Sequence, residues 1–128
     1  MKNKSIIRNA EIINENQKFI GDLAIEDSFI SEIKSESISG TFDLEYDGTG
    51  LTIIPGMIDD QVHFREPGLT HKANIYTESR AAVAGGITSF MEMPNTIPNT
   101  VTQQLLEEKF QIAKKNSLAN YSFFMGAN

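Results

Sequence analysis

From Leu51 onward, three short apolar runs alternate with two helix-like segments, and this order constrains the fold more than any other feature of the sequence. The runs are LTIIPGMIDDQVHF at 51–64, ITSFMEM at 87–93 and YSFFMGA at 121–127. Consecutive strands that are joined through a helix pair in parallel, because the crossover returns the chain to the same end of the sheet. The pattern therefore predicts an α/β fold whose strands all end at one edge.

The two segments between these runs carry the end signals of helices. Residues 74–84 stop at Gly85-Gly86, where a residue that tolerates positive φ can close a helix. Thr100 or Thr102 can cap a second helix, because a hydroxyl there accepts a backbone N–H of the first turn. The apolar stripe of that second helix is formed by Leu106, Phe110 and Ala113.

The first part of the chain is patterned differently. Between residues 6 and 34, apolar side chains alternate with polar ones, which predicts three or four antiparallel strands with one solvated face. Residues 35–50 are polar and turn-rich, with a short strand expected at 42–46. We therefore divide the chain into N-terminal strands at 1–52 and a region of three strands and two helices at 53–128.

Composition excludes several classes of partner and site. The net charge is −6, and no basic cluster is longer than Lys114-Lys115, so nucleic acid is a poor partner. With 0 cysteines, disulfides and thiolate metal sites are excluded. The N-terminus lacks the apolar core of a signal peptide, and no segment approaches the ~20 apolar residues that span a bilayer. We expect a cytoplasmic protein with no membrane contact.

The segment IDDQVHFREPG at 58–68 concentrates charge where the first apolar run ends. In a strand, residues two apart share a face, so Asp59, Gln61, His63 and Arg65 would point one way. The Cα atoms of residues 61 and 63 would be about 6 to 7 Å apart, close enough for both side chains to reach one ion. A lone histidine at a strand end is nevertheless more often a hydrogen-bonded structural residue, and a glutamine oxygen is a weak zinc ligand.

Arg65 and Asn95 are the polar residues best suited to hold an anion. The guanidinium makes two parallel hydrogen bonds to a carboxylate, although an ion pair with Glu66 or Asp60 is the plainer alternative. The amide of Asn95, in MPNT at the end of the second run, could donate to the same anion or only stabilise its own turn. Three weaker candidates, expected to be solvated, are His71, Lys72 and Glu92.

Two segments resemble the opening motifs of the amidohydrolase superfamily, and of dihydroorotases in particular: IIPGMIDDQVHFREPGLTHK at 53–72 and GGITSFMEMPNTIPNT at 85–100. The N-terminal IIRNAEII and GDLAIEDSFISEI also resemble that family's leading strands. The resemblance implies a metal-dependent hydrolase with a TIM barrel beside a small β-sandwich. Because eight strands close such a barrel, three would form an incomplete one, and we expect the isolated chain to be truncated and inactive.

The resemblance also assigns roles. His63 matches a metal-binding histidine, and Gln61 falls where the family usually has its first histidine, so a zinc site would be incomplete in this chain. Arg65 and Asn95 match the pair that holds the substrate carboxylate. The remaining ligands and the general base would come from later strands, so no catalytic residue is expected here.

The resemblance implies the reversible hydrolysis of dihydroorotate to N-carbamoyl-aspartate in pyrimidine synthesis. Allantoinases resemble this pattern with Asn in place of Arg65, and dihydropyrimidinases lack both the Arg and the Met-Pro-Asn-Thr, so these cyclic amidohydrolases are alternatives. Gln61 leaves a further alternative, a catalytically inactive scaffold that binds a partner enzyme. A homodimer of the full-length protein is also an expectation.

Overall fold

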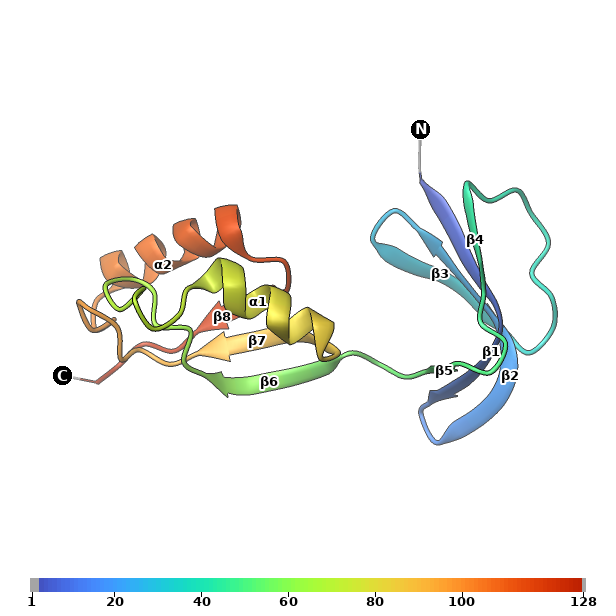
Figure 1. Cartoon of the computed structure of the whole chain (residues 1–128), viewed down its shortest axis with the longest axis horizontal. Helices are drawn as coiled ribbons and strands as arrows, with labels where there is room; N and C mark the ends of the chain where they lie inside the picture. The colour runs from blue at the N-terminus through green and yellow to red at the C-terminus, as the bar shows by residue number, and fades with distance from the viewer. Residues whose placement is uncertain (1–2, 128) are drawn as a thin grey trace. The chain divides into compact units, whose positions relative to one another are not determined.

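The computed structural model describes residues 3–127, and the chain divides into two compact units, Met1–Pro55 and Gly56–Asn128 (Figure 1). Sequence patterning placed the division after residue 52.

The first unit is a five-stranded sheet with the order β3-β2-β1-β4, in which β5 also pairs with β1. The hairpins expected from the alternating pattern are present, because β1 (Lys4–Asn14), β2 (Gln17–Glu26) and β3 (Phe29–Lys34) pair antiparallel in turn. Two short strands, β4 (Leu44–Asp47) and β5 (Thr52–Ile53), instead run parallel to β1. The parallel pairing was not predicted, since strands of four and two residues show no clear periodicity.

A small core holds this sheet together, with Phe42 packed against buried Ile6, Ala24 and Ile38. A β-bulge in β1 lies between Ile7 and Ala10. At this bulge the buried carboxylate of Asp22 accepts hydrogen bonds from the backbone N–H groups of Asn9 and Ile38, both at 3.1 Å, and from the Arg8 guanidinium at 2.9 Å. The charged group therefore ties the bulge to the segment after β3.

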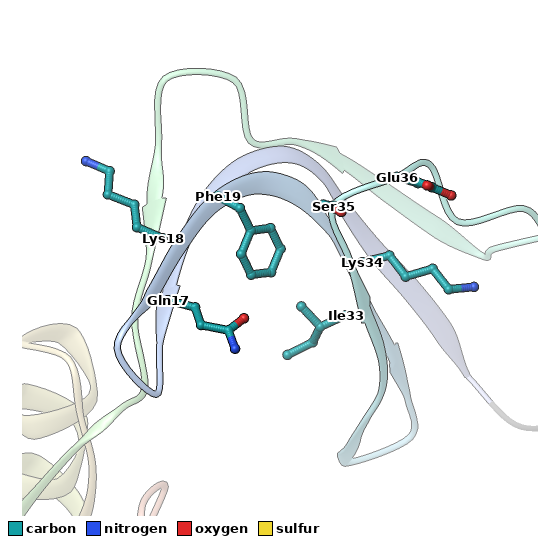
Figure 2. A pocket seen from close by; sticks show the side chains of 7 residues that line it. All are labelled: Gln17, Lys18, Phe19, Ile33, Lys34, Ser35 and Glu36. Carbon is teal, nitrogen blue, oxygen red and sulfur yellow. The ribbon is translucent and has the colours of Figure 1, made fainter.

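The curved sheet of the first unit also encloses an open hollow of about 700 Å³, shown in Figure 2. Phe19 and Ile33 face each other across it, and its charged side chains extend from the rim (Figure 2). Two of these already have partners, since Lys18 pairs with Glu11 at 2.8 Å and Lys34 pairs with Glu32. None of the anion-binding or metal-binding residues predicted from the sequence lines this hollow.

The second unit is a three-stranded parallel sheet with two helices on one of its faces (Figure 1). Its strands, in the order β6-β7-β8, are β6 (Met57–Val62), β7 (Ile87–Glu92) and β8 (Asn120–Phe123). The helices α1 (Ile75–Ala84) and α2 (Gln103–Asn116) connect them in turn. The predicted α/β alternation and parallel pairing are confirmed.

The first apolar run is not the single strand expected at 51–64. Residues Thr52–Ile53 pair within the first unit, and the strand of the second unit begins only at Met57. Pro55 interrupts the run because it has no N–H for a strand ladder. At Gly56 the backbone passes so near Thr88 that an added Cβ would lie 2.2 Å from its Cγ2 atom.

The helix ends follow the capping rules used for the sequence. The Asn74 side chain accepts the N–H of Thr77 at 2.9 Å, and Thr102 accepts the N–H of Leu105 at 3.3 Å. Thr102 is thus the cap of α2, and Thr100 is buried instead. After α1, Gly86 adopts φ +89°, the left-handed conformation that glycine tolerates.

The core of the second unit lies between the sheet and its helices, where Leu106 and Phe110 of the predicted stripe pack against buried residues. These buried residues are Phe64, Ile75, Phe90, Ala113, Ala119 and Phe123. Several other apolar side chains stay exposed, among them Met57, Ile58, Leu118 and Met125. Among residues 3–127, no helix has the length and apolar character to span a bilayer.

Candidate functional site

His63, Arg65 and Asn95 lie just beyond the carboxyl ends of β6 and β7, whereas Gln61 lies within β6. Strand β6 ends at Val62, so His63 and Arg65 belong to the loop that follows it. Arg65 adopts φ +69°, and the strand alternation therefore does not extend to it. The expectation that residues 59, 61, 63 and 65 share one strand face is wrong for Arg65 for this reason.

The loops after β6 and β7 are joined by direct contacts. His63 Nδ1 and Asn95 Oδ1 lie 2.9 Å apart in a hydrogen bond. Further along, the N–H of Ile97 donates to the carbonyl of Pro67 at 3.1 Å. Gly68 has φ +83°, and an added Cβ there would lie 2.1 Å from the Ile97 carbonyl oxygen. The residues predicted from the ends of two different strands thus lie in two loops that pack together.

The hydrogen bond between His63 and Asn95 leaves one useful group on each side chain. An amide oxygen only accepts, so Nδ1 of His63 is the donor in this bond, and in the neutral imidazole Nε2 then keeps a free lone pair. The Nδ2 group of Asn95 keeps its two donor hydrogens. A histidine whose Nδ1 is held by an oxygen is the usual orientation of a metal ligand through Nε2.

Arg65 does not form the ion pair that was its plainer alternative. Arg65 takes no part in the ion pairs found among residues 3–127. Glu66 instead accepts the N–H of Ile75 at 2.9 Å, at the start of α1. The half-buried arginine therefore keeps its guanidinium available for an external anion.

Asn95 also faces a hollow of about 190 Å³ near the ends of β7 and β8. Its other lining residues are Pro94, Asn99, Val101, Gly126 and Ala127. The weaker candidates His71 and Lys72 are exposed, as expected.

Glu92, the third weak candidate, is not solvated as the sequence suggested. It is 1% exposed at the end of β7, and its Oε2 lies 3.0 Å from Nζ of Lys109, which is 0% exposed on α2. The short distance between the two charged groups makes this contact an ion pair, although its geometry is not that of a directed hydrogen bond to Oε2. Nζ also donates to the Met93 carbonyl at 3.1 Å and lies 4.8 Å from the centre of the Phe123 ring.

Burial dominates the electrostatics of this pair. It raises the pKa of Glu92 above its ordinary value and lowers the pKa of Lys109, because each charged form loses water. The attraction between the two groups acts against both shifts. The remaining carboxylate oxygen, Oε1, accepts the backbone N–H of Arg65 at 2.9 Å.

The sequence does carry a signal for this pair. Lys109 is three residues after Leu106 and four before Ala113, so it lies within the apolar stripe of α2. Glu92 is two residues after buried Phe90 and so shares its strand face. A lysine and a glutamate on the buried faces of adjacent elements are rarely left unpaired.

Residues 3–127 contain no group of three or more His, Cys, Asp or Glu side chains placed to hold a metal ion. His63 fits the role of a single ligand, because its Nε2 is free and its ring is oriented by Asn95. Gln61 is exposed and offers only a neutral amide oxygen.

A family model described as Dihydro-orotase-like matches residues 50–123 of the chain. The chain belongs to the dihydro-orotase-like family. This match confirms the family resemblance, and it covers β6, β7, β8 and both helices.

Curated members of related families align with most of this chain. The Methanosarcina acetivorans dihydroorotase is 38% identical over 115 residues, which is 90% of this chain and 25% of that protein. An allantoinase of Salmonella newport is 41% identical over 110 residues, or 85% of this chain and 24% of that protein. The chain therefore spans about a quarter of the length of these curated relatives.

Solved structures match the fold. An L-hydantoinase (dihydropyrimidinase) from Arthrobacter aurescens superimposes with a TM-score of 0.90 at 24% identity, over 98% of this chain and 28% of that one. A D-hydantoinase (dihydropyrimidinase) from Thermus sp. gives a TM-score of 0.71 at 29% identity, over 94% of this chain and 27% of that one. The mixed α/β fold with leading β-strands is thereby confirmed for the part that the chain covers.

Proposed function

We propose that this chain belongs to a dihydroorotase, which interconverts dihydroorotate and N-carbamoyl-aspartate by hydrolysis and closure of a cyclic amide. The pathway would be pyrimidine synthesis in the cytoplasm, and the whole enzyme would act as a homodimer. The chain contributes substrate-binding residues and one metal ligand. We assign the general base to a part of the enzyme outside this chain.

The observation that carries the proposal is the 2.9 Å hydrogen bond between His63 Nδ1 and Asn95 Oδ1. It fastens the Arg65 loop to the Asn95 loop at the carboxyl ends of neighbouring parallel strands. Enzymes built on parallel strands and helices place their working groups at that edge. The family membership of the chain supports the same reading.

The charges of the site favour a carboxylated substrate. Arg65 has no carboxylate partner among residues 3–127, and its planar guanidinium can hold a carboxylate through two parallel hydrogen bonds. The Asn95 Nδ2 group would donate to the same carboxylate. Both residues would orient the ring for attack and take no part in bond making.

His63 would be one ligand of a zinc ion. When bound, such an ion supplies a Lewis acid and a water of lowered pKa for amide hydrolysis. The Asn95 oxygen would keep the proton on Nδ1 of His63 and so present Nε2 to the ion. Because Gln61 stands where the family usually has its first histidine, metal content distinguishes the enzyme from an inactive scaffold. Bound zinc with turnover would reject the scaffold, and absence of both would support it.

The proposal is tested by kcat/KM for dihydroorotate in the whole enzyme. Arg65→Ala removes two charge-assisted hydrogen bonds at about 1.5 kcal/mol or more each, so we expect a loss of at least about 3 kcal/mol, or roughly 150-fold. The matched control is Arg80→Ala, since Arg80 is exposed on α1 and stacks 5.3 Å from the ring centre of Tyr76. Near-normal kcat/KM in Arg65→Ala would remove Arg65 from the substrate site.

Allantoinase is the second candidate, favoured by the 41% identity to the Salmonella newport protein. Allantoin carries no carboxylate, so an arginine at position 65 would gain nothing from it. Turnover of dihydroorotate and allantoin by the same preparation decides between the two. An Arg65→Asn variant that loses dihydroorotate turnover and leaves allantoin turnover unchanged would support dihydroorotase.

A further inference from the structure

The buried pair of Glu92 and Lys109 contains neither a substrate-binding residue nor a metal ligand of the function proposed above. Both side chains are inaccessible to solvent, with exposures of 1% and 0%. An ion pair in such a place generally stabilises a protein no better than two apolar side chains of the same size. The charged groups of this pair also contact other parts of the structure.

The carboxylate of Glu92 connects two parts of the structure. Oε2 lies 3.0 Å from Lys109 Nζ on α2, whereas Oε1 accepts the backbone N–H of Arg65 at 2.9 Å. Lys109 is itself fixed by its bond to the Met93 carbonyl at 3.1 Å. The Glu92 carboxylate is therefore a fixed hydrogen-bond acceptor for the backbone of the loop after β6.

The backbone of Arg65 needs such support. Its φ of +69° lies in the left-handed region, which residues with a Cβ seldom adopt unless surrounding contacts enforce it. Besides the Glu92 bond, the Arg65 carbonyl accepts the N–H of Leu69 at 3.1 Å. The Glu92 hydrogen bond joins the Arg65 loop to strand β7.

We propose that Glu92, held by Lys109, is a positioning residue that fixes the left-handed backbone of Arg65. By fixing this backbone, Glu92 also sets the position from which the carboxylate-binding side chain of Arg65 extends. This inference rests on the proposed function in assigning the guanidinium its ligand. The mechanical part stands on the contacts alone. Lys109 restrains the carboxylate, the carboxylate holds the Arg65 N–H, and the His63 bond to Asn95 fixes the same loop two residues earlier.

Two double variants separate positioning from general core stability. Glu92→Gln with Lys109→Met removes both charges and keeps an acceptor oxygen for Arg65. Glu92→Leu with Lys109→Met removes the same charges and also the acceptor. The readout is amide hydrogen exchange at Arg65, compared with exchange at Met57, whose N–H bonds to Gly86 at the other end of the sheet.

We expect the leucine double variant to exchange the Arg65 amide at least tenfold faster, with Met57 changed less than twofold. The glutamine double variant should retain most of the protection. Equal acceleration at both amides, or equal behaviour of the two variants, would overturn the proposal. If the leucine variant does not fold, the unmodified chain provides the test. The hydrogen bond predicts a scalar coupling between the Arg65 ¹⁵N and the Glu92 side-chain carboxyl ¹³C. The absence of this coupling would overturn the proposal.

Binding of N-carbamoyl-aspartate to the whole enzyme tests the link to function. The leucine double variant should raise its Kd at least tenfold in the Arg65 protein and by less than twofold in an Arg65→Ala background. A tenfold increase in both backgrounds would show that Glu92 does not act through Arg65. If the unmodified enzyme does not bind this compound, the proposed function fails, and the exchange ratio still decides whether Glu92 positions Arg65.

Discussion

Lys109→Met is the single change whose cost follows most directly from the structure. The variant keeps most of the apolar stem and removes the charge, which leaves the Glu92 carboxylate 1% exposed without its cation. Breaking a buried pair in this way costs about 3–5 kcal/mol. That is a large share of the roughly 5–15 kcal/mol by which a domain is stable.

Protonation of Glu92 limits the stability lost in Lys109→Met and makes that loss depend on pH. Holding a carboxyl of ordinary pKa 4.5 neutral at pH 7 takes 2.5 pH units, or about 3.4 kcal/mol. Burial raises the pKa of Glu92 in the folded state and the charge of Lys109 opposes this rise, so loss of Lys109 favours the neutral carboxyl in the folded variant, and the loss should shrink by about 1.4 kcal/mol for each pH unit below 7. At about pH 5 most of the penalty should be gone.

The assay is urea unfolding followed by far-UV circular dichroism at pH 7 and pH 5, since the chain has 0 tryptophans. The matched control is Lys114→Met, an exposed lysine in the last turn of the same helix, which should cost less than about 1 kcal/mol. Glu92→Gln with Lys109→Met should recover most of the loss. A cost of Lys109→Met equal to that of Lys114→Met, or one independent of pH, would show that Lys109 does not stabilise a buried charge on Glu92.

Three further changes have definite expected outcomes. Burial alone would raise the pKa of Asp22, but hydrogen bonds from Ile38, Asn9 and Arg8 outweigh it, so the pKa is lowered in the folded state. The carboxylate therefore stabilises the fold above about pH 4, and this contribution is lost as pH falls through the lowered pKa. Asp22→Asn should make the free energy of unfolding depend less on pH on the acid side, and an unchanged pH dependence would contradict this. Gly68→Ala should cost at least about 1–3 kcal/mol in thermal unfolding and more than Gly86→Ala, because both have positive φ but only Gly68 has a backbone oxygen 2.1 Å from the added Cβ; equal losses would count against the packed loops. Asn74→Ala should cost about 0.5–2 kcal/mol in urea unfolding by removing the cap of α1, and no change would disprove the cap.

The second unit was largely predictable because its signals are local. Asn74, Thr102 and Gly86 mark helix ends through contacts with residues three or four positions away, and the sequence shows both partners. The order of strands and helices then restricts the pairing to a parallel sheet. The short strand expected at 42–46 overlaps β4, but the parallel pairing of β4 and β5 with β1 was not predicted, because it depends on a crossover through residues 35–43, which have no periodicity.

The site was predictable in its residues and less so in its geometry. The proximity of the loops that carry His63 and Asn95 follows from parallel strands ending at one edge, but the hydrogen bond between these two side chains was not predicted. The left-handed backbone of Arg65 was not visible, since arginine has no special preference for positive φ and the conformation is supported by Glu92, 27 positions away. Glu92 was assigned to solvent because a strand end is usually exposed, whereas α2 covers this one.

If Arg65 and Asn95 hold one substrate carboxylate between them, a crystal structure of the whole enzyme with N-carbamoyl-aspartate should show it. We expect two guanidinium nitrogens of Arg65 and Nδ2 of Asn95 within about 3.2 Å of the same carboxylate group. A ligand carboxylate bound elsewhere, with Arg65 directed away from it, would rule out this shared binding site.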